Sequence, residues 1–266
     1  MQTLTFGRRR TPLAHHLPLA RLGTRPGAIG ILPIDESFLA SVLAISPGET
    51  NEYVTKISTS HGTKWAVRIR GLLPPAVAAS ELIQKLTGDT TTRHNPLLDR
   101  PLASFLQAEE YLAIPKKISS DRNYLSVSTY DRDILPLDSL VVIDADSGAT
   151  FGWLSSKAFW LWTQVVSSNA PTATTYQAYN SFPAPALSRK NKEILESAAN
   201  TVLRSRGHFL ETSLTQLYDD VVPDQLLWAH KELDALVNQF FGLARDASDA
   251  EVINALIESY QLLLAA

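Results

Sequence analysis

The stretch SSNAPTATTYQAYNSFPAP, residues 167–185, divides the 266-residue chain into two parts of different pattern. It contains three prolines and no Lys, Arg, Asp or Glu, and it is rich in Ser, Thr, Ala and Asn, which is typical of a loop and a boundary. Short β-prone runs and apolar helical stretches precede it, and a helical pattern follows it. The sequence therefore predicts an α+β fold, with a mixed module over residues 1–186 and a small all-α domain over residues 187–266.

The part after this boundary is predicted to contain helices with recognisable ends. The first follows the N-cap candidate Ser188 and stops at Gly207. A second is expected over residues 224–241, with its first residue as the cap and a glycine directly after it. A third follows a capping box formed by Ser248 and Glu251.

The part before the boundary is irregular. Its β-prone runs are residues 28–34, 65–69, 124–128 and 140–143, separated by Pro, Gly, Asp and Ser. Apolar helical stretches occupy residues 37–45 and 77–86, and an aromatic-rich helix is expected to begin at Ser155. The Trp, Phe and Tyr residues of the last region are expected to be core, because aromatic residues at helical spacing are usually buried.

Composition excludes several classes of protein. Hydrophobic residues make up 45% of the chain and charged residues 19%, as in an ordinary globular protein. There is no cysteine, so disulfides, thiolate nucleophiles and cysteine-bound metals are excluded, and a reducing cytoplasm is expected. No signal-like or membrane-spanning apolar run is found, so we expect neither secretion nor membrane insertion.

The net charge of −3 conceals an asymmetry along the chain. Residues 1–125 carry 15 Lys and Arg against 10 Asp and Glu, whereas the remaining 141 residues carry 9 against 17. The basic excess begins with Arg8–Arg10 and continues in an acid-free stretch, residues 53–80. This pattern indicates one face for a polyanion and another for solvent or a protein partner, although Arg8–Arg10 alone could be a flexible, soluble end.

Catalytic motifs are absent. Neither GxGxxG nor GxxxxGK[ST] occurs, so the common dinucleotide and NTP sites are not encoded. The tetrapeptide Asn95–Leu98 is similar to the start of an amino-methyltransferase loop, but leucines replace the second proline and the stacking aromatic residue. Pairs that could bind metal lack companions at ligand spacing: His15 with His16, Asp144 with Asp146, and Asp219 with Asp220. We therefore expect no catalytic residue, no metal and no cofactor on this chain.

Three segments, in order, resemble one family. They are IPKKISSDRNYL (residues 114–125), FGWLSS (residues 151–156) and YNSFPAP (residues 179–185), and a helical tail over residues 213–234 follows them. They are similar to the target recognition domain and C-terminal helical domain of MmeI-like, adenine-specific DNA methyltransferases. The resemblance implies double-stranded DNA as a partner. It also implies a separate methyltransferase catalytic subunit or domain, which would carry S-adenosylmethionine.

This chain departs from the family pattern at two places. Ala158 and Phe159 stand where the family has Met and His, so any role of that histidine is missing. A Tyr- and Arg-rich stretch of the family is shortened and replaced by residues 168–174. Proteins that recognise different targets are expected to differ in such a stretch.

The candidate nucleic-acid-binding residues form three groups. The first motif offers cations and hydroxyls for phosphates: Lys116, Lys117, Ser119, Ser120 and Arg122. An expected helix start adds backbone N–H groups for another phosphate: Ser155, Ser156 and Lys157. The uncharged loop offers groups for base edges and stacking: Ser168, Asn169, Thr172, Thr174 and Tyr176. Residues 119–121 could instead form only a capped turn.

Two functions are weighed first from the sequence, and an enzyme with an unrecognised active site is a third, which binding of a methyl-donor cofactor by the isolated chain would support. The first is a DNA recognition module that supplies sequence specificity to an adenine-specific methyltransferase of a restriction-modification system. The second is a protein-interaction or phage-defence accessory module that keeps the recognition fold without binding DNA. Salt-dependent affinity for duplex DNA distinguishes them.

Overall fold

The computed structural model describes residues 6, 9–25, 31–35, 39–40, 54–68, 108–117, 122–145, 148–169, 173–219 and 221–265. Its strands are β1 (Ala20–Leu22), β2 (Ile31–Ile34), β3 (Val54–Thr59), β4 (Gly62–Arg68), β5 (Glu110–Pro115), β6 (Ser128–Asp131), β7 (Leu135–Pro136) and β8 (Leu140–Ile143). Its helices are α5 (Gly148–Ser155), α6 (Lys157–Asn169), α7 (Thr175–Ser181), α8 (Arg189–Arg206), η4 (Gly207–Phe209), α9 (Leu214–Asp219), α10 (Asp224–Phe240) and α11 (Asp249–Ala265). The predicted α+β class is confirmed.

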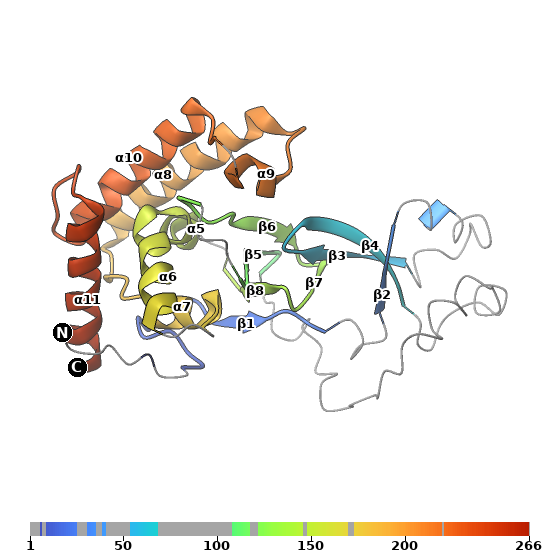
Figure 1. Cartoon of the computed structure of the whole chain (residues 1–266), viewed down its shortest axis with the longest axis horizontal. Coiled ribbons are helices and arrows are strands. Elements are labelled where there is room, and N and C mark those ends of the chain that lie inside the picture. The colour runs from blue at the N-terminus through green and yellow to red at the C-terminus, as the bar shows by residue number, and fades with distance from the viewer. Residues whose placement is uncertain are drawn as a thin grey trace.

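The strands form two sheets beside a helical layer. The first sheet has the order β1-β8-β5-β6 with antiparallel neighbours. The second has the order β2-β4-β3-β7, in which β3 and β7 run parallel. Figure 1 shows the helices gathered at one end, the first sheet in the middle and the second sheet extending toward the opposite end.

Alternation along the central strands separates the two faces of the first sheet. One face joins the main core, which also contains the helices: Leu112, Ile114, Val141 and Ile143. The opposite face forms a smaller cluster: Tyr111, Ala113, Leu140 and Val142. The hydroxyl of Tyr111 links the two sheets, because it donates to the carbonyl oxygen of Ile134 at 2.7 Å and lies 2.8 Å from the hydroxyl of Ser58.

Helix α5 packs closely against α8. Gly152 permits this approach, because a Cβ atom at that position would lie 2.9 Å from Cδ1 of Leu195. The aromatic residues of this region are core, as predicted: Trp153, Phe159, Trp160, Trp162, Tyr179 and Phe182 are all at most 4% exposed. The helices therefore share one aromatic-rich interior with the first sheet.

Several predicted elements are confirmed. The run 140–143 is β8, and the run 65–69 lies largely in β4. Helix α8 is capped by Ser188, whose side chain accepts from the N–H of Asn191, and ends at Gly207. The Ser248–Glu251 capping box precedes α11, with the N–H of Ser248 donating to the Glu251 carboxylate at 2.8 Å.

Other predictions were wrong in position. Residues 124–127 are not in a strand, and β6 begins only at Ser128. The cap of α10 is Pro223, not Asp224. The helix expected from Ser155 is α6, which begins two residues later at Lys157, and α5, which ends at Ser155, was not predicted. The expected loop at residues 167–185 contains α7 and the end of α6.

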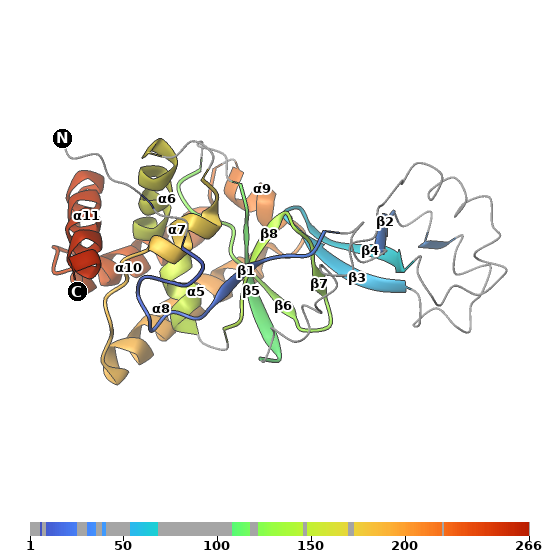
Figure 2. The same cartoon turned by 90° about the horizontal axis from the view of Figure 1, so that it is seen from below.

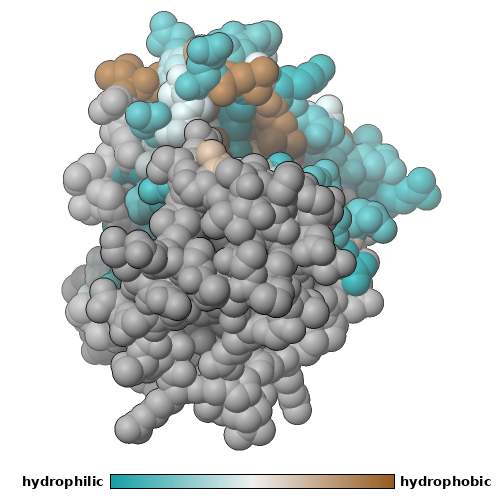
Figure 3. Space-filling view, turned by 90° about the vertical axis from the view of Figure 1, so that its right-hand side faces the viewer, coloured by the Kyte–Doolittle hydropathy of each residue, from teal (hydrophilic) through white to brown (hydrophobic). Residues whose placement is uncertain are grey.

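The predicted helix 77–86, and all but residues 39–40 of the predicted helix 37–45, lie outside the described residues. Among the described helices, none has both the length and the apolar character needed to cross a membrane. Exposed apolar side chains include Leu210 and Val221, which flank α9. Seen from the end that the second sheet approaches, the described surface is mostly hydrophilic with separate hydrophobic patches (Figure 3).

Candidate nucleic-acid interface

Helix α7 is fixed to the end of β5. The N–H of Thr175 donates to the carbonyl oxygen of Lys116 at 3.2 Å. The hydroxyl of Thr175 donates to the carbonyl oxygen of Pro115 at 2.6 Å. Lys116 is half-buried and Lys117 is exposed. The predicted cationic pair therefore lies where α7 begins.

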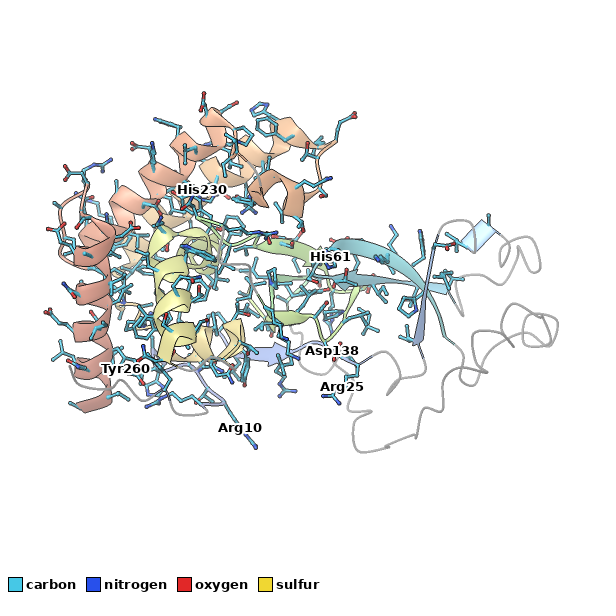
Figure 4. All side chains as sticks on the ribbon, viewed as in Figure 1. Arg10, Arg25, His61, Asp138, His230 and Tyr260 are labelled. Atoms are coloured by element: carbon cyan, nitrogen blue, oxygen red, sulfur yellow. The ribbon has the colours of Figure 1, made fainter. Side chains whose placement is uncertain are left out.

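The same helix holds a segment from the start of the chain. The hydroxyl of Tyr176 donates to the carbonyl oxygen of Arg10, and the Asn180 side chain donates to that of Arg9, both at 3.2 Å. The N–H of Leu13 donates to the backbone of Asn180 at 2.8 Å. Arg10 is exposed, and Figure 4 shows its side chain directed away from the body of the molecule.

The backbones of two cationic pairs that are more than 100 residues apart are thus bonded to one short helix. We call Arg9, Arg10, Lys116 and Lys117 the α7 cationic face; Figure 2 looks onto this side of the molecule. Lys116 and Lys117 are predicted from the sequence as contacts, whereas Arg9 and Arg10 are not. The basic triplet Arg8–Arg10 was the available signal, but its position depends on bonds to α7.

The predicted base-reading residues differ in how exposed their side chains are and in which groups they already bond. Ser168 and Asn169 are exposed at the end of α6, and the Asn169 side chain donates to the carbonyl oxygen of Val165 at 2.8 Å. Thr174 donates through its N–H and its hydroxyl to the side-chain oxygen of Gln177. The half-buried ring of Tyr176 packs against the core.

Of the other predicted contacts, Arg122 is among the described residues and three others are not. Arg122 is half-buried and donates to the hydroxyl of Ser126 at 3.3 Å. Ser119, Ser120 and Thr172 lie outside the described residues. The structure therefore tests the position of Arg122 but not of the other three.

The expected phosphate site at Ser155, Ser156 and Lys157 needs correction. Ser155 and Ser156 have 0% exposure, and the hydroxyl of Ser156 donates to the carbonyl oxygen of Trp153 at 2.7 Å. The N–H of Lys157 donates to Asp234 at 2.7 Å, and its ammonium group lies 3.4 Å from the Asp249 carboxylate. The Ser155 hydroxyl is buried without a hydrogen-bond partner among the described residues, and the groups of Ser156 and Lys157 are bonded within the protein, so this set does not form the predicted phosphate site.

They belong to a larger set that we call the buried polar network: Tyr124, Ser155, Lys157, Arg206, Tyr218, His230 and Asp234. Asp234 accepts from the hydroxyl of Tyr124 at 2.7 Å as well as from Lys157. The ring of Tyr124 stacks on that of His230, with 4.1 Å between ring centroids. Residues of the family-like motifs therefore meet at the junction between the helical tail and the preceding module.

Hydrogen bonds give His230 a defined tautomer. Its Nδ1 lies 3.1 Å from the carbonyl oxygen of Ser155, which can only accept, so Nδ1 carries the proton. Nε2 then accepts from the hydroxyl of Tyr218 at 2.7 Å, and that hydroxyl accepts from Nε of Arg206 at 2.8 Å. Burial, helped by the Arg206 charge, lowers the pKa of His230 to about 3, so the ring is neutral at pH 7.

Among the described residues, no group of three or more His, Asp or Glu side chains could hold a metal ion. The α7 cationic face instead offers guanidinium and ammonium groups, with side-chain hydroxyls and amides beside them. This chemistry suits binding of an anionic polymer.

Known proteins share this fold and sequence pattern. Residues 77–186 match the family described as "MmeI, target recognition domain", and residues 187–266 match "MmeI, C-terminal domain". DNA methyltransferase A of Bacillus subtilis (strain 168) is 29% identical over 154 residues, which cover 56% of this chain and 17% of that protein.

A solved structure supports the same assignment of the fold. The type IIL restriction-modification enzyme MmeI in complex with DNA aligns with a TM-score of 0.76 at 22% identity. The alignment covers 97% of this chain and 37% of MmeI. This chain thus spans well under half the length of either relative.

Proposed function

The chain belongs to the MmeI family, whose target recognition and C-terminal domains it carries, and we propose that it binds duplex DNA sequence-specifically through the α7 cationic face. The observation that carries the proposal is that the backbones of Arg9, Arg10 and Lys116 are all bonded to α7, which brings the two basic segments to one helix. Such cations neutralise phosphates and set the position of a protein on DNA. The solved MmeI structure with a similar fold contains DNA, which is consistent with this use.

Base recognition is assigned to the neighbouring polar segment. Ser168, Asn169 and Thr174 are donors and acceptors without formal charge, which is suitable for base edges. Thr172 and the phosphate contacts Ser119 and Ser120 remain predictions. Ser155 and Ser156 are not part of the proposed surface, because they are buried.

We assign two functional units, with DNA recognition over residues 1–186 and a helical domain over residues 187–266. Catalysis is assigned to a methyltransferase subunit or domain that binds S-adenosylmethionine and modifies adenine. The acidic helical domain is its proposed docking surface, since it carries 12 Asp and Glu against 7 Lys and Arg. A cytoplasmic location fits a cysteine-free partner of such an enzyme.

Binding of a randomised duplex pool, measured with the full chain at two salt concentrations, tests the proposal. We expect enrichment of a short motif and affinity that falls with salt. The double variant Arg9→Ala with Arg10→Ala keeps the backbone carbonyls that bind α7. It should make the negative slope of log K against log [salt] shallower by about 2, because each phosphate contact contributes about −0.9.

Lys231→Ala is the matched control. Lys231 is exposed on α10, which Figure 1 places on the side away from α7, so its loss should leave the slope unchanged. Equal effects of both variants would contradict a specific α7 surface. Absence of DNA binding, with a stable protein complex recovered from the native host, would instead support the protein-interaction function.

A further inference from the structure

The hairpin formed by β3 and β4 carries basic residues that are not part of the α7 cationic face. Residues 54–68 include Lys56, His61, Lys64 and Arg68 and contain no Asp or Glu. The hairpin also precedes residues 77–266, which the two family descriptions cover. A run of basic side chains without a carboxylate in the same run creates a local positive potential, which attracts anions even on a protein of net charge −3.

Lys56 is held in a defined place on this hairpin. It is the cross-strand partner of Trp65, and its Nζ lies 5.2 Å from the centroid of the Trp65 ring. Lys56 is exposed and Trp65 is half-buried. The cation–π contact reduces the motion of the side chain while leaving the ammonium group open to a ligand.

An open hollow lies beside the same tryptophan. Its volume is about 470 Å³, and its lining is Pro33, Ile34, Asp35, Thr63, Lys64 and Trp65. Trp65 and Ile34 supply an apolar wall, whereas Lys64, Thr63 and the acidic Asp35 are exposed polar groups, so a phosphate would be bound on the Lys64 side of the hollow. This combination fits a sugar with its phosphate, since a sugar ring packs on an indole and a phosphate accepts from an ammonium group.

The hairpin is fixed relative to the α7 cationic face through Ser139. The N–H of Ser60 donates to the hydroxyl of Ser139 at 3.1 Å, and the N–H of Lys116 donates to the carbonyl oxygen of Ser139 at 2.8 Å. Lys56 is four residues from Ser60, about 13 Å along an extended strand. One turn of DNA measures about 34 Å, so a single duplex is long enough to reach both Lys116 and Lys56.

We propose that the β3–β4 hairpin is a second contact for the DNA backbone, in which Lys56 and Lys64 bind phosphates and Trp65 positions Lys56. This inference rests on the proposed function. It adds a site that contributes affinity without base recognition, because the groups involved are cations and an indole. The α7 face and its polar loop keep the role of selecting the sequence.

Duplex binding by the full chain over a range of salt concentrations tests this site. The double variant Lys56→Ala with Lys64→Ala should make the negative slope of log K against log [salt] shallower by about 2. The motif enriched from a random pool should stay the same. Lys231→Ala again serves as the control, with no expected change in slope.

Two variants of Trp65 separate positioning from folding. Trp65→Phe keeps an aromatic face and should retain most of the wild-type slope, whereas Trp65→Leu should lose about one unit, because Lys56 is no longer held. Thermal unfolding of each variant identifies any loss of the fold, and the two lysine substitutions at exposed positions should leave the unfolding temperature unchanged.

The outcomes distinguish this site from the proposed function. Motif-selective binding with wild-type slopes in the lysine variants would overturn the hairpin site alone. Salt-dependent binding without a motif, weakened by the lysine variants, would support the hairpin and overturn sequence recognition. No DNA binding by the wild-type chain at low salt would overturn both.

Discussion

Asp234 is the residue whose titration should be visible in the stability of the whole fold. Burial raises its pKa from 3.8 to about 6, against the opposing effect of hydrogen bonds from Lys157 and Tyr124. The folded state therefore binds this proton more tightly than the unfolded state. Its stabilising contribution is complete below pH 3.8 and is lost as the pH rises through about 6.

The variant Asp234→Asn removes this titration but keeps an oxygen for the N–H of Lys157. We expect the free energy of unfolding of the wild type, relative to the variant, to fall by on the order of 1–2 kcal/mol between pH 4 and pH 7. Denaturant unfolding of both proteins over this range measures the difference. A constant difference would contradict a raised pKa.

The same residues show how far sequence reasoning reaches at this scale. Lys116 and Lys117 were identified because a cationic pair beside hydroxyls is visible locally. The burial of Ser155 and the bonding of Lys157 were not visible, since His230 and Asp234, which contact their backbones, lie about 75 residues further along the chain. A serine at a helix start has the same sequence pattern whether its hydroxyl faces solvent or the interior.

At the scale of the element, local signals predicted some boundaries and long-range bonds decided others. The ends of α8 follow from Ser188 and Gly207, whose effects are confined to one turn. Helix α7 was missed although its start carries a local signal, a capping box of Thr174 and Gln177, and the bonds to Lys116 and Pro115 then fix this start to β5. Residues 124–127 have strand composition, but the carbonyl oxygen of Val127 accepts from Arg206 at 2.6 Å.

The contact between α5 and α8 provides a test at this scale. Gly152→Ala would place a Cβ atom 2.9 Å from Cδ1 and 3.0 Å from Cγ of the fully buried Leu195. The helices must separate or Leu195 must shift, and we expect a loss of about 1–3 kcal/mol in the free energy of unfolding. Thermal or denaturant unfolding measures it.

Gly148→Ala is the control in the same helix. Its Cβ would meet only Glu196, at 3.4 Å or more, which is ordinary van der Waals contact. Alanine also favours the helical state over glycine by up to about 1 kcal/mol, so stability should be unchanged or slightly higher. Equal destabilisation by the two substitutions would show that close packing at Gly152 is not the cause.

At the scale of the whole molecule, the two units divided by the sequence share one interior. One buried cluster contains residues of both units: Leu195, Ala199 and Leu233 from residues 187–266, and Phe151 and Ile114 from residues 1–186. The buried polar network crosses the same junction. The composition change at residues 167–185 marks a change of pattern, but it contains no information about how the two parts pack.

A chain ending at residue 186 should therefore not fold by itself. It would expose apolar surface of α5 and leave the hydroxyl of Tyr124 and the N–H of Lys157 without the Asp234 carboxylate, and each loss costs stability. We expect broad amide NMR signals and rapid proteolysis for this fragment, and a native spectrum when residues 187–266 are added in trans. A sharp, protease-resistant fragment would show instead that recognition and helical units are independent domains, and the buried polar network would then be a docking contact between two folded bodies.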